Sequence, residues 1–293
     1  MTNDRGSTRP SRTEKEREPG SRRSPGGARR PISVAAAAGW TIGAILVVPI
    51  FLGLAEEARP GAQADLVTFT GCYVVTYLLI LFAMLRVYEP ETSIREVVGL
   101  RSVSPVAPVL AAIAGAGCYP TLSLLEGLVA RRLEAPSEDE QEIVAKLFSA
   151  HGVGSRGFLF VAMALLVPLT QEAFFRGALY GGLKRGRGRV EALLAAAACS
   201  VFPDLRTLAT TLVIGLLLAW LRAESGSVAP SFAANAAFSA VPIVRYFQTS
   251  TFEDRYPRPW TIGGAAAAIV ALAALFAIFR KDPRAVAGRA ADG

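Results

Sequence analysis

The chain has 293 residues, of which 52% are hydrophobic, and a formal net charge of +7 from 31 basic and 24 acidic residues. Its apolar residues gather in long runs, several of them of about 18 residues or more, which excludes an ordinary soluble domain and indicates transmembrane helices. We therefore read the basic excess first as a signal of membrane orientation and not as a nucleic-acid surface, and we expect the lipid bilayer to be the chain's main partner.

Residues 1–31 are rich in Arg, Gly, Ser and Pro and show no apolar periodicity. This composition is typical of a disordered segment, and we predict a disordered basic cytoplasmic tail here. Residues 32–280 form the predicted transmembrane domain, and residues 281–293 a second, short cytoplasmic tail.

Eight apolar segments follow one another through the transmembrane domain. They lie at roughly 33–54, 66–86, 104–128, 157–182, 190–203, 207–222, 227–247 and 260–279. They predict an all-α membrane protein, a bundle of about eight transmembrane helices. The fifth and sixth segments are short and are separated by Pro203 and Asp204, so they either cross separately or form one broken helix pair that does not fully cross.

Lysine and arginine are more frequent in the loops on the N-terminal side of this bundle than in the loops on the opposite side, and the run from Lys184 to Arg189 is the densest. Cytoplasmic loops of membrane proteins carry such an excess. Both termini are therefore predicted to be cytoplasmic, in a multi-pass protein of the cell membrane.

The loop at 129–155, on the predicted outer side, contains a helical pattern. Ser137 followed by Glu140 is typical of a capping box, and apolar residues then recur at helical spacing up to Phe148. We predict a short interfacial helix. His151, the single histidine of the chain, follows it beside two glycines and is most simply a solvated or helix-capping residue.

The stretch QEAFFRG at 171–177 places Gln171, Glu172 and Arg176 inside an apolar segment. Residues four apart lie on one helix face, so Glu172 and Arg176 can neutralise each other. A charged residue at the centre of a membrane helix costs about 2.5–3.5 kcal/mol on insertion scales, and such residues usually face the protein interior and mark a functional site. The alternative is a buried pair that only holds helices together.

Three stretches, taken in order, resemble the motifs of the CPBP family of intramembrane metalloproteases, which includes CAAX prenyl endopeptidases and bacteriocin-processing enzymes. The family pattern is E-E-x-x-x-R followed by Gly, then F-x-x-x-H, then H-x-x-x-N. QEAFFRG is similar to the first motif, FPDLR at 202–206 takes the place of the second, and GSVAPSFAANAAFSA at 226–240 takes the place of the third. The resemblance covers roughly residues 35–280 and implies a CAAX-protease-like helical bundle in a bacterial inner membrane.

The resemblance also implies site residues, and four of them are substituted. Glu172 and Arg176 are kept, whereas Gln171 stands in place of the first Glu, Arg206 and Asn235 in place of the two His, and Ser239 in place of the Asn. A carboxamide cannot accept a proton from water at neutral pH, and a guanidinium has no lone pair for a metal. We therefore expect a catalytically impaired pseudoprotease, with a divalent metal such as zinc only if the family activity survives.

Such a protein is expected to bind a membrane peptide or a prenylated protein tail. Two other interpretations stay open. One is an active endopeptidase with a rearranged site around Glu172. The other is a small transporter or channel component, in which Glu172, Asp204 and Arg206 line a polar path; these three residues are also candidates for a compensating ion network.

Overall fold

The computed structural model describes residues 30–90, 93–130, 138–149, 152–200, 207–249 and 256–281, and in these residues it contains helices and no strand. The helices are α1 (Val34–Ala58), α2 (Leu66–Tyr88), α3 (Ile94–Val98), α4 (Val106–Ala130), α5 (Glu138–Phe148), α6 (Val153–Phe160), α7 (Val167–Glu172), α8 (Tyr180–Lys184), α9 (Arg189–Cys199), α10 (Leu208–Ser225), α11 (Val228–Thr249) and α12 (Arg258–Lys281), with a 3₁₀ turn at Ala62–Ala64. The all-α prediction is confirmed. The two predicted tails fall almost wholly outside the described residues and stay predictions.

Local side chains determine where several helices begin and end. The Ser33 hydroxyl accepts a hydrogen bond from the Ala36 backbone N–H over 3.1 Å, and the Asp65 carboxylate accepts one from the Thr68 N–H over 3.1 Å. These caps satisfy backbone donors that the first turn of a helix leaves free. Gly99 and Gly226, which end α3 and α10, both have a φ of +66°, a conformation that favours glycine.

One long helix, Val153–Lys184, runs through the middle of the bundle and is the most buried of the long apolar helices. It comprises α6, α7 and α8, joined by π-helical segments at Val161–Leu166 and Ala173–Leu179. A π-helical segment is wider than an α-helix and breaks the normal i→i−4 hydrogen-bond ladder, and such segments are frequent at functional sites. The second one begins directly after Glu172 and contains Arg176.

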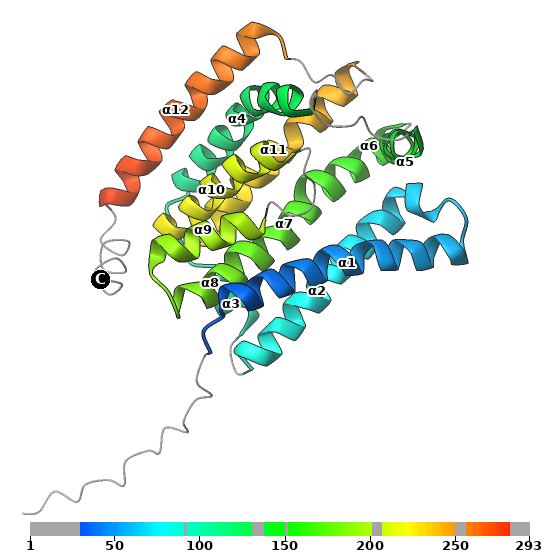
Figure 1. The fold of residues 1–293 in the computed structure, drawn as a ribbon. Coiled ribbons are helices and arrows are strands. Elements are labelled where there is room, and N and C mark those ends of the chain that lie inside the picture. The colour runs from blue at the N-terminus through cyan, green and yellow to red at the C-terminus, as the bar shows by residue number, and fades with distance from the viewer. Residues whose placement is uncertain are drawn as a thin grey trace, which may run out of the picture.

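The other helices pack on both sides of this central helix (Figure 1). On one side α4 packs along both α11 and α12, and on the other side α1 and α2 form an antiparallel pair. Glycines let α4 approach its neighbours closely, since a Cβ at Gly115 would collide with the Ala234 carbonyl of α11 and one at Gly117 with the Gly264 carbonyl of α12. Such small-residue contacts are typical of helix packing in membranes.

Six of the described helices are long and apolar enough to cross a membrane: α1, α2, α4, the central helix, α10 and α12. Helix α11 has 22 residues, long enough to cross, but it is not among these six. Helix α9 has only 11 residues, about 16 Å at the usual rise, and is too short for a hydrocarbon core of about 30 Å. A bundle of membrane helices is thus confirmed, whereas the number eight stays a prediction.

The described chain starts and finishes at the same end of the bundle. The Ile32 N–H donates to the Gly182 carbonyl of α8 over 3.0 Å, and Phe279 near the end of α12 packs its ring on Trp220 of α10 with centroids 6.1 Å apart. Ion pairs at this end join Arg185 to Glu89 and Arg189 to Glu224. We call it the α8 end; which side of the membrane it faces stays a prediction.

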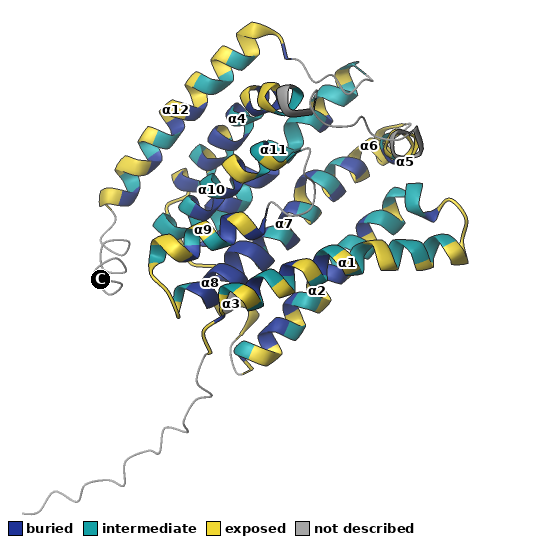
Figure 2. Ribbon diagram, viewed as in Figure 1, coloured by how far each residue is buried: buried dark blue, intermediate teal, exposed yellow. Residues whose placement is uncertain are grey.

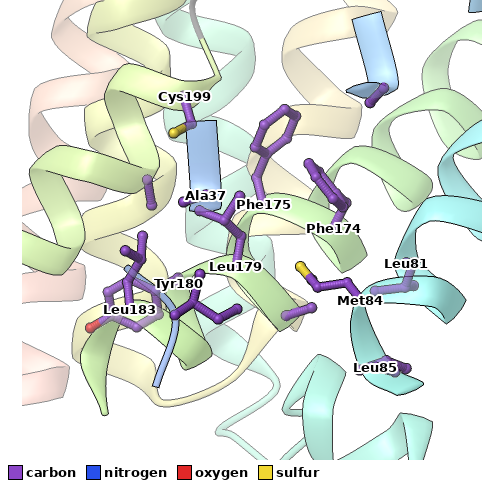
Figure 3. Packing of buried hydrophobic residues seen from close by; sticks show 14 of the residues in the cluster. Ala37, Leu81, Met84, Leu85, Phe174, Phe175, Leu179, Tyr180, Leu183 and Cys199 are labelled. Atoms are coloured by element: carbon purple, nitrogen blue, oxygen red, sulfur yellow. The ribbon is translucent and has the colours of Figure 1, made fainter. Parts of the chain in front are cut away.

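The largest buried cluster lies around the second π-helical segment (Figure 3). It includes Phe174, Phe175 and Leu179 of that segment, with Met84 of α2 and Ala37 of α1 beside them. Exposed apolar residues, by contrast, follow the outer faces of α1, α2 and α12 (Figure 2). That is the surface expected of helices that face lipid, because lipid tails do not oppose exposure of apolar side chains.

Helix α5 confirms the predicted helix in the loop at 129–155. Its Leu147 is buried, and the ring of Phe148 packs on Tyr246 of α11 with centroids 5.8 Å apart, whereas Val144 on the same predicted face is 45% exposed. The predicted cap Ser137 and His151 lie outside the described residues.

Candidate functional site

The central helix carries the acidic and basic residues of the first motif. Glu172 ends α7 and is 0% exposed, and Arg176 in the π-helical segment is 2% exposed. The Arg176 Nη1 atom lies 3.3 Å from the Glu172 Oε1 atom, which confirms the predicted i, i+4 pair. This is a fully buried ion pair, which folding must desolvate, so it has to be supported by further hydrogen bonds.

Helix α11 supplies the first of these hydrogen bonds. The Asn235 side-chain N–H₂ donates to the Glu172 Oε1 atom over 3.1 Å and, more weakly, to the Gln171 Oε1 atom over 3.5 Å. Ser231, one turn earlier on α11, lies beside Glu172, but its hydroxyl donates to the Val228 carbonyl over 3.0 Å. The second oxygen of the carboxylate, Glu172 Oε2, is buried and has no hydrogen-bond partner among the described residues.

Helix α2 approaches the site from the other side. The Gln171 side-chain N–H₂ donates to the Tyr73 hydroxyl over 2.7 Å. The Tyr73 ring stacks on that of Tyr77, with centroids 4.6 Å apart, and Tyr77 packs edge-on against Phe174. Gln171 therefore bridges α2 and α11, and both Gln171 and Tyr73 are only partly buried.

Helices α9 and α10 hold the guanidinium of Arg176. Its Nη2 atom donates to the Gly215 carbonyl over 3.2 Å and to the Ser200 hydroxyl over 3.4 Å, and that hydroxyl donates to the Ala197 carbonyl over 2.7 Å. A Cβ at Gly215 would lie 2.7 Å from the Ser200 Oγ atom, so only glycine leaves room for this contact. The Arg176 Nε atom is buried and finds no hydrogen-bond partner in the part of the chain that the structure describes.

The backbone of the π-helical segment is also held by its neighbours. The Tyr180 N–H donates to the Gly177 and Phe175 carbonyls, three and five residues earlier, and not to the Arg176 carbonyl four residues earlier. Arg222 of α10 donates instead from its Nε atom to the Arg176 carbonyl over 2.9 Å. The glycine of the motif, Gly177, lies against α3, because a Cβ there would come within 2.9 Å of the Val98 Cα atom.

The donor atoms around Glu172 do not fit a divalent metal. The Glu172 Oε1 atom already accepts a hydrogen bond from Asn235 and forms an ion pair with Arg176. The neighbouring side chains of Gln171 and Asn235 offer only carboxamide groups. Catalytic zinc sites use imidazole, thiolate and carboxylate ligands, and a guanidinium 3.3 Å from the carboxylate opposes a second cation. Among the described residues, no group of three or more His, Cys, Asp or Glu side chains lies close enough to hold a metal ion.

Four of the sequence-predicted site residues thus come together: Gln171, Glu172, Arg176 and Asn235. Ser239 is partly buried one turn further along α11, and no hydrogen bond joins it to these four within the described part of the chain. Arg206 and Asp204 lie outside the described residues, so the predicted ion network with Glu172 stays a prediction.

Sequence reasoning missed Tyr73, Ser200, Gly215, Ser231 and Arg222 as parts of this site. Ser231 could have been found, since it precedes Asn235 by four residues and so shares its helix face. The other four lie on α2, directly after α9, or on α10, and have no local spacing to the motif residues.

The comparison with known proteins gives a match over the part of the chain that forms this site. Residues 154–241, which span the central helix to the middle of α11, match the family model described as type II CAAX prenyl endopeptidase Rce1-like. No curated protein and no solved structure matches the chain. Residues 154–241 are thus similar to the CAAX prenyl endopeptidase family, in the part of the chain that contains the three motifs.

Proposed function

We propose that this protein is a pseudoprotease of the CAAX family, which binds a membrane peptide or a lipidated protein segment without cleaving it. The observation that carries the proposal is the hydrogen bonding of Gln171 and Asn235. These two carboxamides stand where the resemblance implies a general base and a histidine. The Asn235 side-chain N–H₂ donates both to Gln171 and to Glu172.

The remaining carboxylate is poorly suited to replace the base. Glu172 is 0% exposed, and its Oε1 atom is bound by Arg176 and Asn235. A general base has to reach the water from which it takes a proton, directly or through one further water. These contacts argue against the rearranged endopeptidase and support a structural role for the Glu172–Arg176 pair.

The chemistry of the cluster suits an amide ligand. Carboxamides both donate and accept hydrogen bonds, as a peptide backbone does, and they carry no charge that a membrane segment would have to neutralise. Gln171 and Tyr73 are only partly buried, so they form the side of the cluster that a ligand can approach.

The test compares the natural chain with a revertant that carries Gln171→Glu, Arg206→His, Asn235→His and Ser239→Asn. Both are purified in detergent, and their zinc content and their cleavage of a farnesylated CAAX peptide are measured. We expect the natural chain to bind the peptide without cleaving it, and the revertant to take up zinc or to cleave. Glu172→Gln in the revertant background is the matched control and should abolish cleavage.

Efficient cleavage by the natural chain would overturn the proposal. If that cleavage were lost in Glu172→Gln, the rearranged endopeptidase would replace it. Failure of the natural chain to bind the peptide, with the revertant binding normally, would also overturn the binding role.

A further inference from the structure

Two arginines, Arg101 and Arg222, lie near each other at the α8 end of the bundle, and Arg222 also joins this end to the cluster around Glu172 through its bond to the Arg176 carbonyl. Arg222 lies in the last turn of α10, and Arg101 lies in the loop between α3 and α4. The two segments are joined by hydrogen bonds, since the Val228 N–H donates to the Gly99 carbonyl over 3.3 Å and the Ser227 hydroxyl to the Arg101 carbonyl over 3.0 Å.

The Arg222 guanidinium is held rigidly at this junction. Its Nε atom donates to the Arg176 carbonyl over 2.9 Å, and its centre lies 5.9 Å from the centroid of the Tyr180 ring. Its outer nitrogens lie against Gly99, where a Cβ would come within 2.9 Å of the guanidinium carbon. This arrangement orients the Nη1 and Nη2 donors of Arg222 while leaving them without an acceptor among the described residues.

Neither arginine forms an ion pair in the described part of the chain. The buried or partly buried carboxylates at this end are paired elsewhere, Glu89 with Arg185 and Glu224 with Arg189. The Arg101 side chain makes no ion pair there, and its Nη1 atom lies beside Gly226, the residue that ends the helix of Arg222, since a Cβ at Gly226 would come within 3.9 Å of it. Two adjacent guanidinium groups with free donors are the arrangement that recognises a phosphate.

The location also fits an anion from the membrane surface. Arg222 lies one turn before the end of an apolar helix, Arg101 is exposed just before α4 begins, and the positive end of the 22-residue α11 begins at the same junction. The ends of membrane helices lie at the depth of the lipid headgroups, and basic sites between helices bind anionic headgroups there.

We propose that Arg101 and Arg222 form a binding site for a phosphate-bearing anion, either the headgroup of an anionic phospholipid or free phosphate. Because Arg222 also bonds to the Arg176 backbone, an anion bound at this site would stabilise the π-helical segment that carries the Arg176 side chain.

The test measures the thermal unfolding midpoint of the purified full chain in a neutral detergent. The probes are phosphatidylglycerol, zwitterionic phosphatidylcholine and inorganic phosphate. Arg101→Gln is the main variant, because Arg101 is exposed and does not contact Arg176. Arg280→Gln on α12 is the matched control, since it removes the same charge from another exposed arginine near the same end.

We expect phosphatidylglycerol, but not phosphatidylcholine, to raise the midpoint saturably in the natural chain and in Arg280→Gln. Loss of one charge-assisted hydrogen bond should weaken the apparent affinity of Arg101→Gln about tenfold or more. Arg101→Lys keeps the charge and should lose less. If inorganic phosphate reproduces the shift, the ligand is free phosphate; if it does not, the ligand is the lipid.

Equal responses of Arg101→Gln and Arg280→Gln would overturn the proposal, as would the absence of any shift in the natural chain. Should Arg101→Gln fail to fold, the same comparison between Arg101→Lys and Arg280→Lys decides, with the lipids bound to each counted by native mass spectrometry.

Discussion

Asn235 donates a hydrogen bond to the Glu172 carboxylate over 3.1 Å, although the two residues lie 63 positions apart in the chain. This bond joins α11 to the central helix at the point where the π-helical segment begins. It places a carboxamide where the family resemblance implies an imidazole. The substituted motif residue, Asn235, therefore helps to hold a retained motif residue, Glu172.

The Glu172–Arg176 pair should contribute strongly to stability. Arg176→Met leaves the Glu172 carboxylate buried without its cation, and breaking such a pair costs about 3–5 kcal/mol. Glu172→Gln together with Arg176→Met should recover part of that loss, because no charge is then left unpaired. The free energy of unfolding in mixed micelles measures both effects.

An exposed ion pair offers the control for this cycle. The Arg187 Nη1 atom lies 3.4 Å from Glu191 on the surface, and Arg187→Met should cost less than about 1 kcal/mol. Equal losses for Arg176→Met and Arg187→Met would contradict the structural role assigned to the buried pair.

The close approach of α4 and α11 predicts a sharp difference between two glycines of one helix. Gly115→Ala puts a methyl group into the Ala234 carbonyl and should lower the unfolding free energy by about 1–3 kcal/mol, the usual cost of overpacking. Gly127→Ala meets nothing within 4 Å and should be neutral or slightly stabilising, because alanine favours helix. Thermal unfolding of the two variants side by side checks this, and similar losses for both would show that α4 does not pack on α11 in this register.

The bond between Gln171 and Tyr73 can be measured with a double-mutant cycle. Tyr73→Phe leaves the Gln171 N–H₂ without its acceptor, and Gln171→Leu leaves the Tyr73 hydroxyl without its donor. We expect the two changes to be non-additive by about 1 kcal/mol in unfolding free energy, the usual size for one hydrogen bond. Strict additivity would mean that the two side chains do not interact.

The N-terminal cap of α2 should give a stability difference that depends on pH. Hydrogen bonds from Thr68 and Arg59 hold the pKa of the Asp65 carboxyl below its usual value. A lowered folded-state pKa stabilises the fold above the unfolded pKa of about 3.9, and this stabilisation is lost as the pH falls through the folded pKa. Asp65→Ala should therefore cost about 1 kcal/mol at neutral pH, and the cost should shrink in acid.

Thermal midpoints of the natural chain and Asp65→Ala, followed from neutral pH into acid, test this prediction. A difference between them that grows on acidification would be the opposite of what the lowered pKa requires. The side chain is 38% exposed, so salt should reduce the part that comes from the Arg59 charge.

Features of this protein that depend on residues close together in the chain could be predicted from the sequence alone. The apolar runs located the helices, because burying backbone in lipid requires helical hydrogen bonding along the whole run. The four-residue spacing predicted the Glu172–Arg176 pair, because residues four apart lie on the same face of a helix. The short fifth run left open whether it crosses the membrane separately, and α9 has only 11 residues.

Only the tertiary structure decided which helices surround that pair. Tyr73, Ser200, Gly215 and Asn235 reach Gln171, Glu172 or Arg176 from four different helices. The relative positions of these helices depend on how closely they pack, as at Gly115. They also depend on the π-helical segment, in which the Arg176 carbonyl accepts a hydrogen bond from Arg222. Neither the packing distance nor the helix widening has a periodic signal in the sequence, because both result from the sum of many contacts between distant residues.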